Sequence, residues 1–129
     1  MKIHATALSL NVPDPASSAE FAIEHFGFRE EMSADGFVSL THPDAAFNIA
    51  LLRTGLGTFK PASIAGSAGQ GMLIAFVVDD VDTEFARIAD AGATVVTPPE
   101  TEPWGERYCQ FADPNGIVWQ LVHWVSDPA

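Results

Sequence analysis

Two stretches of this chain follow the same order of predicted elements, and this duplication restricts the possible folds more than any other feature. In residues 8–28, an apolar strand is followed by a helix with apolar residues at i, i+3, i+4 and i+7, then a glycine and a second strand. Residues 73–96 repeat that order about 65 positions later, which is half of the 129-residue chain. Two copies at so long a spacing are not typical of a solenoid, so we predict two similar modules in tandem.

The helix in each copy has recognisable start and stop signals. In the first copy Asp14 stands at the N-cap position before a proline, and Gly27 follows the last apolar position. In the second copy either Asp79 or Asp80 is the candidate cap, and Gly92 ends the helix. Both copies are therefore expected to pack one capped helix against strands.

Three short strand-like runs follow each helix, which gives an α+β fold of two βαβββ modules. The first module is predicted over residues 1–53 and the second over residues 72–129. Residues 54–71 between them are rich in Gly, Ser, Pro and Ala, as is typical of a linker. The predicted strands after the helices are residues 28–33, 37–42, 46–53, 93–97, 106–112 and 117–125.

Charge and composition exclude several classes of partner. The chain has only six Lys and Arg against 17 Asp and Glu, a formal charge of −11. Nucleic acids and anionic membrane surfaces bind clustered cations, so we expect neither as a partner. The N-terminus lacks the apolar stretch of a signal peptide, and no apolar run approaches the about 20 residues that span a bilayer. Because Cys109 is the only cysteine, no internal disulfide can form, and we expect a soluble cytoplasmic protein.

The passages "LIAFVVDDVDTEFARIADAGATVV" and "PWGERYCQFADPNGIVWQLVHW" resemble the vicinal oxygen chelate superfamily, which includes glyoxalase I, extradiol dioxygenases and bleomycin-resistance proteins. The resemblance covers nearly the whole chain. It implies paired βαβββ modules whose curved mixed sheets enclose a cavity, with the helices outside. It also implies a homodimer with pockets near a module or subunit interface.

Metalloenzymes of that superfamily bind a divalent ion through one side chain from the first strand and one from the last strand of each module, usually His or Glu. Counting from the "VPD" and "DPNG" turns and from the end of the second module's first strand places Ala7, Leu73 and Gln120 at three of these positions. The fourth is Ala50, with Asn48 as the alternative. Ala and Leu have no lone pair and Gln is a weak neutral ligand, so we expect neither a metal nor another cofactor.

Strand alternation extends these positions into a predicted surface for a small organic molecule. Small residues leave room, and Ser9, Asn48 and Gln120 can orient a guest, although the same small residues would also let two sheets approach closely. Aromatic and basic side chains near the rim can stack on a flat ring or pair with a carboxylate. The predicted ligand-contacting residues are Ala7, Ser9, Phe37, Phe47, Asn48, Ala50, Leu73, Ala75, Trp104, Arg107, Tyr108, Gln120 and Trp124.

The four histidines form no H-x-H or H-E-x-x-H pair. We expect His25 on a helix surface and His42 in a turn, while alternation places His4 and His123 on the helix-facing side of their strands. None of them is predicted to bind a metal.

These features favour a metal-free binding protein over an enzyme. It would sequester an aromatic or heteroaromatic compound, as the resistance proteins of the superfamily do. The alternative is an enzyme of the lyase, isomerase or dioxygenase type, with a displaced metal or with an acid and base drawn from Glu106, Tyr108 and Gln120. A third possibility is an interaction module that only dimerises or regulates.

Overall fold

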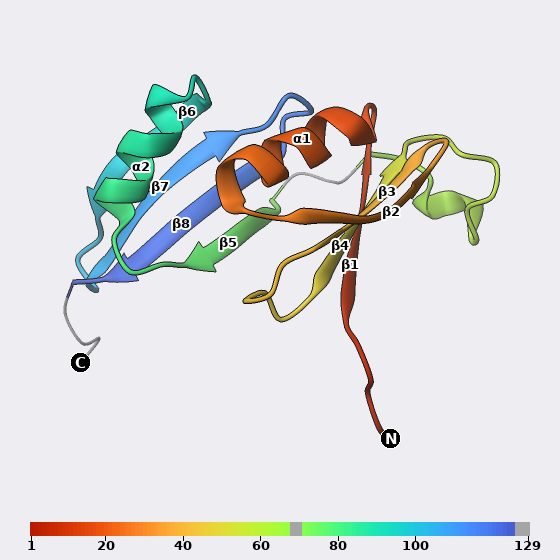
Figure 1. Ribbon diagram of the computed structural model, residues 1–129, viewed down its shortest axis with the longest axis horizontal. Coiled ribbons are helices and arrows are strands. Elements are labelled where there is room, and N and C mark those ends of the chain that lie inside the picture. Colours follow the sequence, from red (N-terminus) through yellow and green to blue (C-terminus); the bar gives the residue numbers. More distant parts are fainter. Residues whose placement is uncertain (68–70, 126–129) are drawn as a thin grey trace. The chain divides into compact units, whose positions relative to one another are not determined.

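The computed structural model describes residues 1–67 and 71–125, which divide into two compact units, Met1–Gln70 and Gly71–Ala129. Each unit contains one α-helix and a four-stranded mixed sheet (Figure 1). The predicted α+β class and the tandem βαβββ order are thereby confirmed. No helix in the described ranges is both long and apolar enough to cross a membrane.

The first unit has the strand order β1-β4-β3-β2, in which β1 and β4 are parallel and the other neighbours are antiparallel. Its helix begins after Asp14 and ends at Gly27, whose φ of 75° is the left-handed conformation that glycine adopts without strain. The elements of this unit are β1 (Ala7–Val12), α1 (Pro15–Phe26), β2 (Arg29–Ala34), β3 (Phe37–Thr41) and β4 (Asn48–Arg53).

The sheet side of the first unit's core comes from alternate residues of β1, β3 and β4, while β2 is exposed throughout. These apolar side chains are at most 8% exposed, and their neighbours along each strand are more exposed, as expected for a sheet with one covered face. Helix α1 contacts all four strands of this sheet. The buried strand residues are Leu10, Val12, Val38, Leu40, Ile49 and Leu51.

The Gly- and Ser-rich segment after β4 belongs to the first unit as far as residue 67. It contains a short 3₁₀ helix, η1 (Ala62–Ile64), and the Gly55 amide donates a 2.8 Å hydrogen bond to the carbonyl of Ala65. The side-chain amide of Asn11 also donates to the carbonyls of Ile64 and Gly66. Part of the predicted linker, residues 68–70, lies outside the described residues.

The second unit has the strand order β5-β8-β7-β6, with β5 and β8 parallel and the other neighbours antiparallel. The carboxylate of Asp80 accepts hydrogen bonds from the amides of Asp82 at 3.0 Å and Thr83 at 3.4 Å, so Asp80 is the helix cap and Asp79 is not. The elements of this unit are β5 (Leu73–Val77), α2 (Val81–Asp90), β6 (Thr94–Thr101), β7 (Glu106–Ala112) and β8 (Val118–Trp124).

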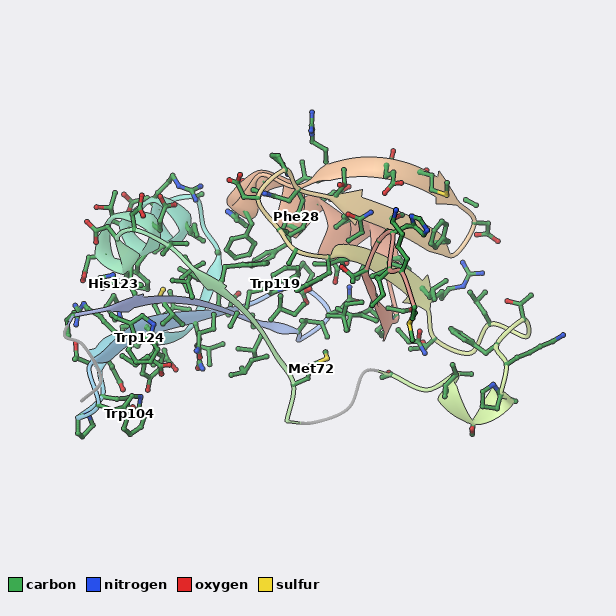
Figure 2. All side chains as sticks on the ribbon, turned by 90° about the horizontal axis from the view of Figure 1, so that it is seen from below. Phe28, Met72, Trp104, Trp119, His123 and Trp124 are labelled. Carbon is green, nitrogen blue, oxygen red and sulfur yellow. The ribbon has the colours of Figure 1, made fainter. Side chains whose placement is uncertain are left out.

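The core of the second unit contains two large aromatic side chains. Phe111 and Trp119 are completely buried, and the Phe85 ring of α2 stacks on Phe111 at a centroid distance of 5.5 Å. The indole of Trp119, labelled in Figure 2, donates to the carboxylate of Asp113 at 3.2 Å. That carboxylate also accepts the Ile117 amide at 3.0 Å, so the "DPNG" turn is fixed to the core beneath it.

Three local predictions were wrong. His25 is only 6% exposed and packs edge-on against Phe21 at 4.8 Å, because it lies on the buried stripe of α1. His4 is exposed and precedes β1, so strand alternation does not apply to it. Strand β6 continues to Thr101, four residues beyond its predicted end, because it lies at a sheet edge and contains bulges that accommodate two prolines.

Candidate functional site

The face of the second unit's sheet opposite α2, called here its helix-free face, carries a row of polar side chains. The strand registers place Ala75, Gln120, Gln110 and Thr97 side by side across all four strands. The Thr97 hydroxyl donates to Oε1 of Gln110 at 2.7 Å, and Nε2 of Gln110 donates to Oε1 of Gln120 at 2.7 Å. Gln120 itself is buried, with only 8% of its surface exposed. Two amides and a hydroxyl are thereby fixed in one row across the sheet.

Apolar rows flank this polar row on both sides. Leu73 pairs with Val118 in one row, and Val77 pairs with Val122 in the other. Leu73 is 49% exposed and Val77 is 74% exposed. Clustered exposed apolar side chains beside a few fixed polar groups are typical of surfaces that bind small molecules.

Tyr108 lies next to this surface, opposite Val122 in the register. Its hydroxyl donates to the carboxylate of Glu102 at 2.7 Å and lies 3.4 Å from that of Glu100. The hydrogen bond to Glu102, together with desolvation and the two negative charges, raises the pKa of Tyr108 to about 12. The phenol is therefore neutral at physiological pH and can stack on, or hydrogen-bond to, a bound molecule.

Two tryptophans lie at the end of the second unit where β7 begins and β8 ends (Figure 2). Trp124 is opposite Glu106 in the register and is 47% exposed, while Trp104 lies in the turn before β7 and is 56% exposed. The Val125 amide donates to the carbonyl of Gly105 at 2.9 Å, which joins that turn to the end of β8. Both indoles have free ring surface for stacking.

Arg107 lies on the opposite side of the sheet from Tyr108, because neighbouring residues of a strand point to opposite faces. Its guanidinium donates to both carboxylate oxygens of Asp82 in α2, at 2.6 and 2.7 Å, and to the hydroxyl of Thr101 at 2.9 Å. The same hydrogen bonds hold the pKa of Asp82 below its ordinary value. The structure therefore gives Arg107 a role in fixing α2 to its sheet.

In the first unit, five predicted site residues share the face opposite α1. Ala7 pairs with Asn48, Ser9 pairs with Ala50, and Phe37 pairs with Leu52 on the same face. The side-chain amide of Asn48 donates to the carboxylate of Glu31 at 2.9 Å. Phe47 lies outside the sheet, directly before β4, and is partly exposed.

The registers also settle which position of the first unit corresponds to Gln120. Ala7 pairs with Asn48 as Leu73 pairs with Val118, so the equivalent of Gln120 is Ala50. Within residues 1–67 and 71–125, no three His, Cys, Asp or Glu side chains come together in a way that could hold a metal ion.

Gln110, Thr97 and Glu102 lie beside the predicted site residues but were not predicted from the sequence. The signal for Gln110 was present, because a hairpin closed by the "DPNG" turn pairs residues at equal distances from the turn, and this places Gln110 opposite Gln120. Thr97 had no comparable signal, since its register depends on the bulges of β6. Glu102 comes to Tyr108 only through the turn that precedes β7.

Comparisons with known proteins agree with this architecture. A protein-family model described as "Glyoxalase/Bleomycin resistance protein/Dioxygenase superfamily" matches residues 2–121. A glyoxalase/bleomycin resistance protein/dioxygenase from Nocardioides, known from its crystal structure, is 25% identical with a TM-score of 0.78, covering 100% of this chain and 89% of that chain. TnmS3, described as an antibiotic binding protein from Streptomyces sp. CB03234, is 24% identical with a TM-score of 0.69, covering 99% of this chain and 98% of that chain.

Curated relatives match a shorter region. An uncharacterized protein of Mycobacterium bovis is 44% identical over 64 residues, which are 50% of this chain and 40% of that protein. The match thus spans well under two thirds of that relative's length. From the family match over residues 2–121, the chain belongs to the glyoxalase/bleomycin resistance protein/dioxygenase superfamily.

Proposed function

We propose that this protein binds and sequesters a small aromatic or heteroaromatic compound, without a metal, on the helix-free face of its second unit. The observation that carries the proposal is the hydrogen-bonded row of Thr97, Gln110 and Gln120 between exposed apolar side chains. Fixed polar groups orient a ligand, and the apolar rows supply the free energy of burial. Covering the exposed half of a side chain such as Leu73 contributes about 1 kcal/mol.

The exposed aromatic residues indicate a planar ligand. Trp104, Trp124 and Tyr108 provide ring surface at one end of the second unit. Offset stacking on such rings stabilises a flat compound by about 1 kcal/mol beyond the burial of area. The known relative TnmS3, which shares this fold, is described as an antibiotic binding protein, and this supports a ligand of the same general kind.

We also propose that the face of the first unit opposite α1 contacts a ligand. Ala7, Ser9 and Ala50 are small, and Phe37 on that face and Phe47 beside it offer aromatic surface. The substitution Ala7→Trp places a large side chain on this face and should block access to it. Loss of binding in that variant would assign the first unit to the ligand, and unchanged affinity would remove it.

The enzymatic alternative would use Tyr108 as an acid or base. General acid–base catalysis works best with a group whose pKa is near the working pH. The Tyr108 pKa of about 12 is far above that range, so we assign Tyr108 a binding role.

We also propose that the protein is a homodimer, which sedimentation equilibrium of the ligand-free chain tests directly.

The test is a binding titration of the purified chain with a panel of planar compounds, followed through tryptophan fluorescence. We expect saturable quenching that Trp104→Phe and Trp124→Phe reduce, because Trp119 is buried. Gln120→Ala should weaken binding about tenfold, the loss of one hydrogen bond to the ligand. Asp90→Asn, at the exposed end of α2, is the matched control and should bind normally. Absence of saturable binding across the panel would contradict the proposal.

A further inference from the structure

The three polar side chains on the helix-free face of the second unit form a chain of hydrogen bonds with one direction. Thr97 donates to Oε1 of Gln110, and Nε2 of Gln110 donates to Oε1 of Gln120. Each amide oxygen thus accepts one hydrogen bond from the preceding donor. The chain of bonds ends on the Nε2 group of Gln120, which can only donate.

That terminal amide group has an unused donor. Within the described parts of the chain, no side chain or backbone group accepts a hydrogen bond from Nε2 of Gln120, although the residue is 92% buried, with only 8% exposed. Its other neighbour in the row, Ala75, has only a methyl group. Nε2 is not fully enclosed, so an atom of a ligand can reach it. An N–H group without a protein partner in such a place favours a ligand atom that can accept its hydrogen bond.

The charge around this face selects among possible acceptors. Glu100 and Glu102 lie beside Tyr108 two residues along β7 from Gln110, and the chain carries a formal charge of −11. A ligand carboxylate would be repelled by this field, whereas a neutral carbonyl oxygen would not. The apolar rows formed by Leu73 and Val77 then suit the ring that carries this carbonyl.

We infer that the compound bound on this face is an uncharged planar molecule with a ring carbonyl, and that this oxygen accepts the free N–H of Gln120. The inference rests on the proposed function and narrows it to one chemical class. It distinguishes acceptors from donors, since a ring N–H directed at Gln120 would meet another N–H. The expected preference for an acceptor over a donor of the same shape is at least about tenfold.

The experiment compares three tricyclic probes of nearly equal shape by equilibrium dialysis. 9-Fluorenone presents a carbonyl acceptor, carbazole presents an N–H donor at the same position, and fluorene presents neither. The wild-type protein should bind fluorenone about tenfold more tightly than the other two. Equal binding of all three overturns the inference and leaves the proposed function intact, whereas failure of all three to bind overturns both.

Gln120→Glu is the decisive variant because it keeps the oxygen that accepts from Gln110 and replaces the outward N–H by an oxygen. It should lose affinity for fluorenone about tenfold and prefer carbazole. An unchanged preference for fluorenone would contradict the inference. If this variant does not fold, Gln120→Met replaces it: the methionine removes the donor without adding a charge, and fluorenone should then bind no better than fluorene.

Discussion

The guanidinium of Arg107 in β7 binds both carboxylate oxygens of Asp82 in α2, through Nε at 2.7 Å and Nη2 at 2.6 Å. This pair connects the helix of the second unit to its sheet. At the same end of α2, the amide of Val81 donates a hydrogen bond to Nδ1 of His123 in β8 at 2.8 Å. Arg107, which the sequence suggested for ligand contact, thus fixes α2 to the sheet whose opposite face we propose as the ligand surface.

Arg107→Gln should lower the urea midpoint slightly, by about 0.3 M, because partly exposed ion pairs contribute little. The Asp82 pKa is lowered in the folded state, so this contribution is present above its unfolded value of about 3.8 and is lost as the pH falls below it. Wild type and variant should therefore differ at pH 7 and converge in acid. Urea unfolding of both proteins at pH 7 and in acid measures this difference. A large loss of ligand affinity in the variant would instead indicate that Arg107 contacts the ligand.

Tyr108 is the only tyrosine of the chain, so its ionisation can be followed by ultraviolet absorbance without overlap. We expect a midpoint near pH 12 in the folded protein, against about 10 in urea. The raised pKa favours the neutral phenol, so its contribution to stability is complete below pH 10 and is lost as the pH rises toward 12. Glu102→Gln should move the folded midpoint toward 10; a wild-type midpoint already at 10 would contradict the hydrogen bond.

Cys109 should be unreactive in the folded protein. Its side chain is fully buried, and burial raises the pKa of the thiol to about 11. Ellman's reagent at pH 8 should therefore titrate no thiol until urea is added, and then one per chain. Rapid modification without denaturant would show that β7 opens, or that its pairing with β8 is wrong.

Gly27→Ala should destabilise the first unit by about 1 kcal/mol, because φ is 75° and an added Cβ would lie 3.4 Å from Nε2 of His42. Gly57→Ala is the matched control. Its φ is not in the left-handed region, and apart from its chain neighbours no atom of the described residues lies within 4 Å of an added Cβ. This variant should stay within about 0.5 kcal/mol of wild type in thermal or urea unfolding. Equal effects of the two substitutions would contradict the left-handed cap.

Much of the fold follows from local patterns in the sequence. Caps depend on the chemistry of one residue, so Gly27 could be predicted and the cap of α2 could be narrowed to Asp79 or Asp80. The period of two along β8 likewise separates Trp119, which packs in the core, from Gln120 on the other face. These signals involve residues that are close together in the sequence, so they can be recognised without knowledge of the tertiary structure.

The less predictable features depend on irregular geometry or on distant partners. The bulges of β6 shift the register that brings Thr97 to Gln110, and no residue pattern announces that shift. Arg107 could have been assigned to the helix side by alternation with Tyr108, but its partner Asp82 lies 25 residues earlier. A basic residue near aromatic ones is compatible with ligand binding and with an ion pair, and only the fold distinguishes them.

The parallel pairing of first and last strands has a consequence for synthesis of the protein. In each unit the opening strand hydrogen-bonds to the closing one, β1 to β4 and β5 to β8. A nascent chain therefore cannot complete its first sheet until residues 48–53 have left the ribosome, and its second until residues 118–124 have emerged. Until then, apolar segments such as β5 lack the strand with which they pair in the folded unit. Such segments are prone to aggregation unless chaperones bind them or synthesis and folding finish quickly.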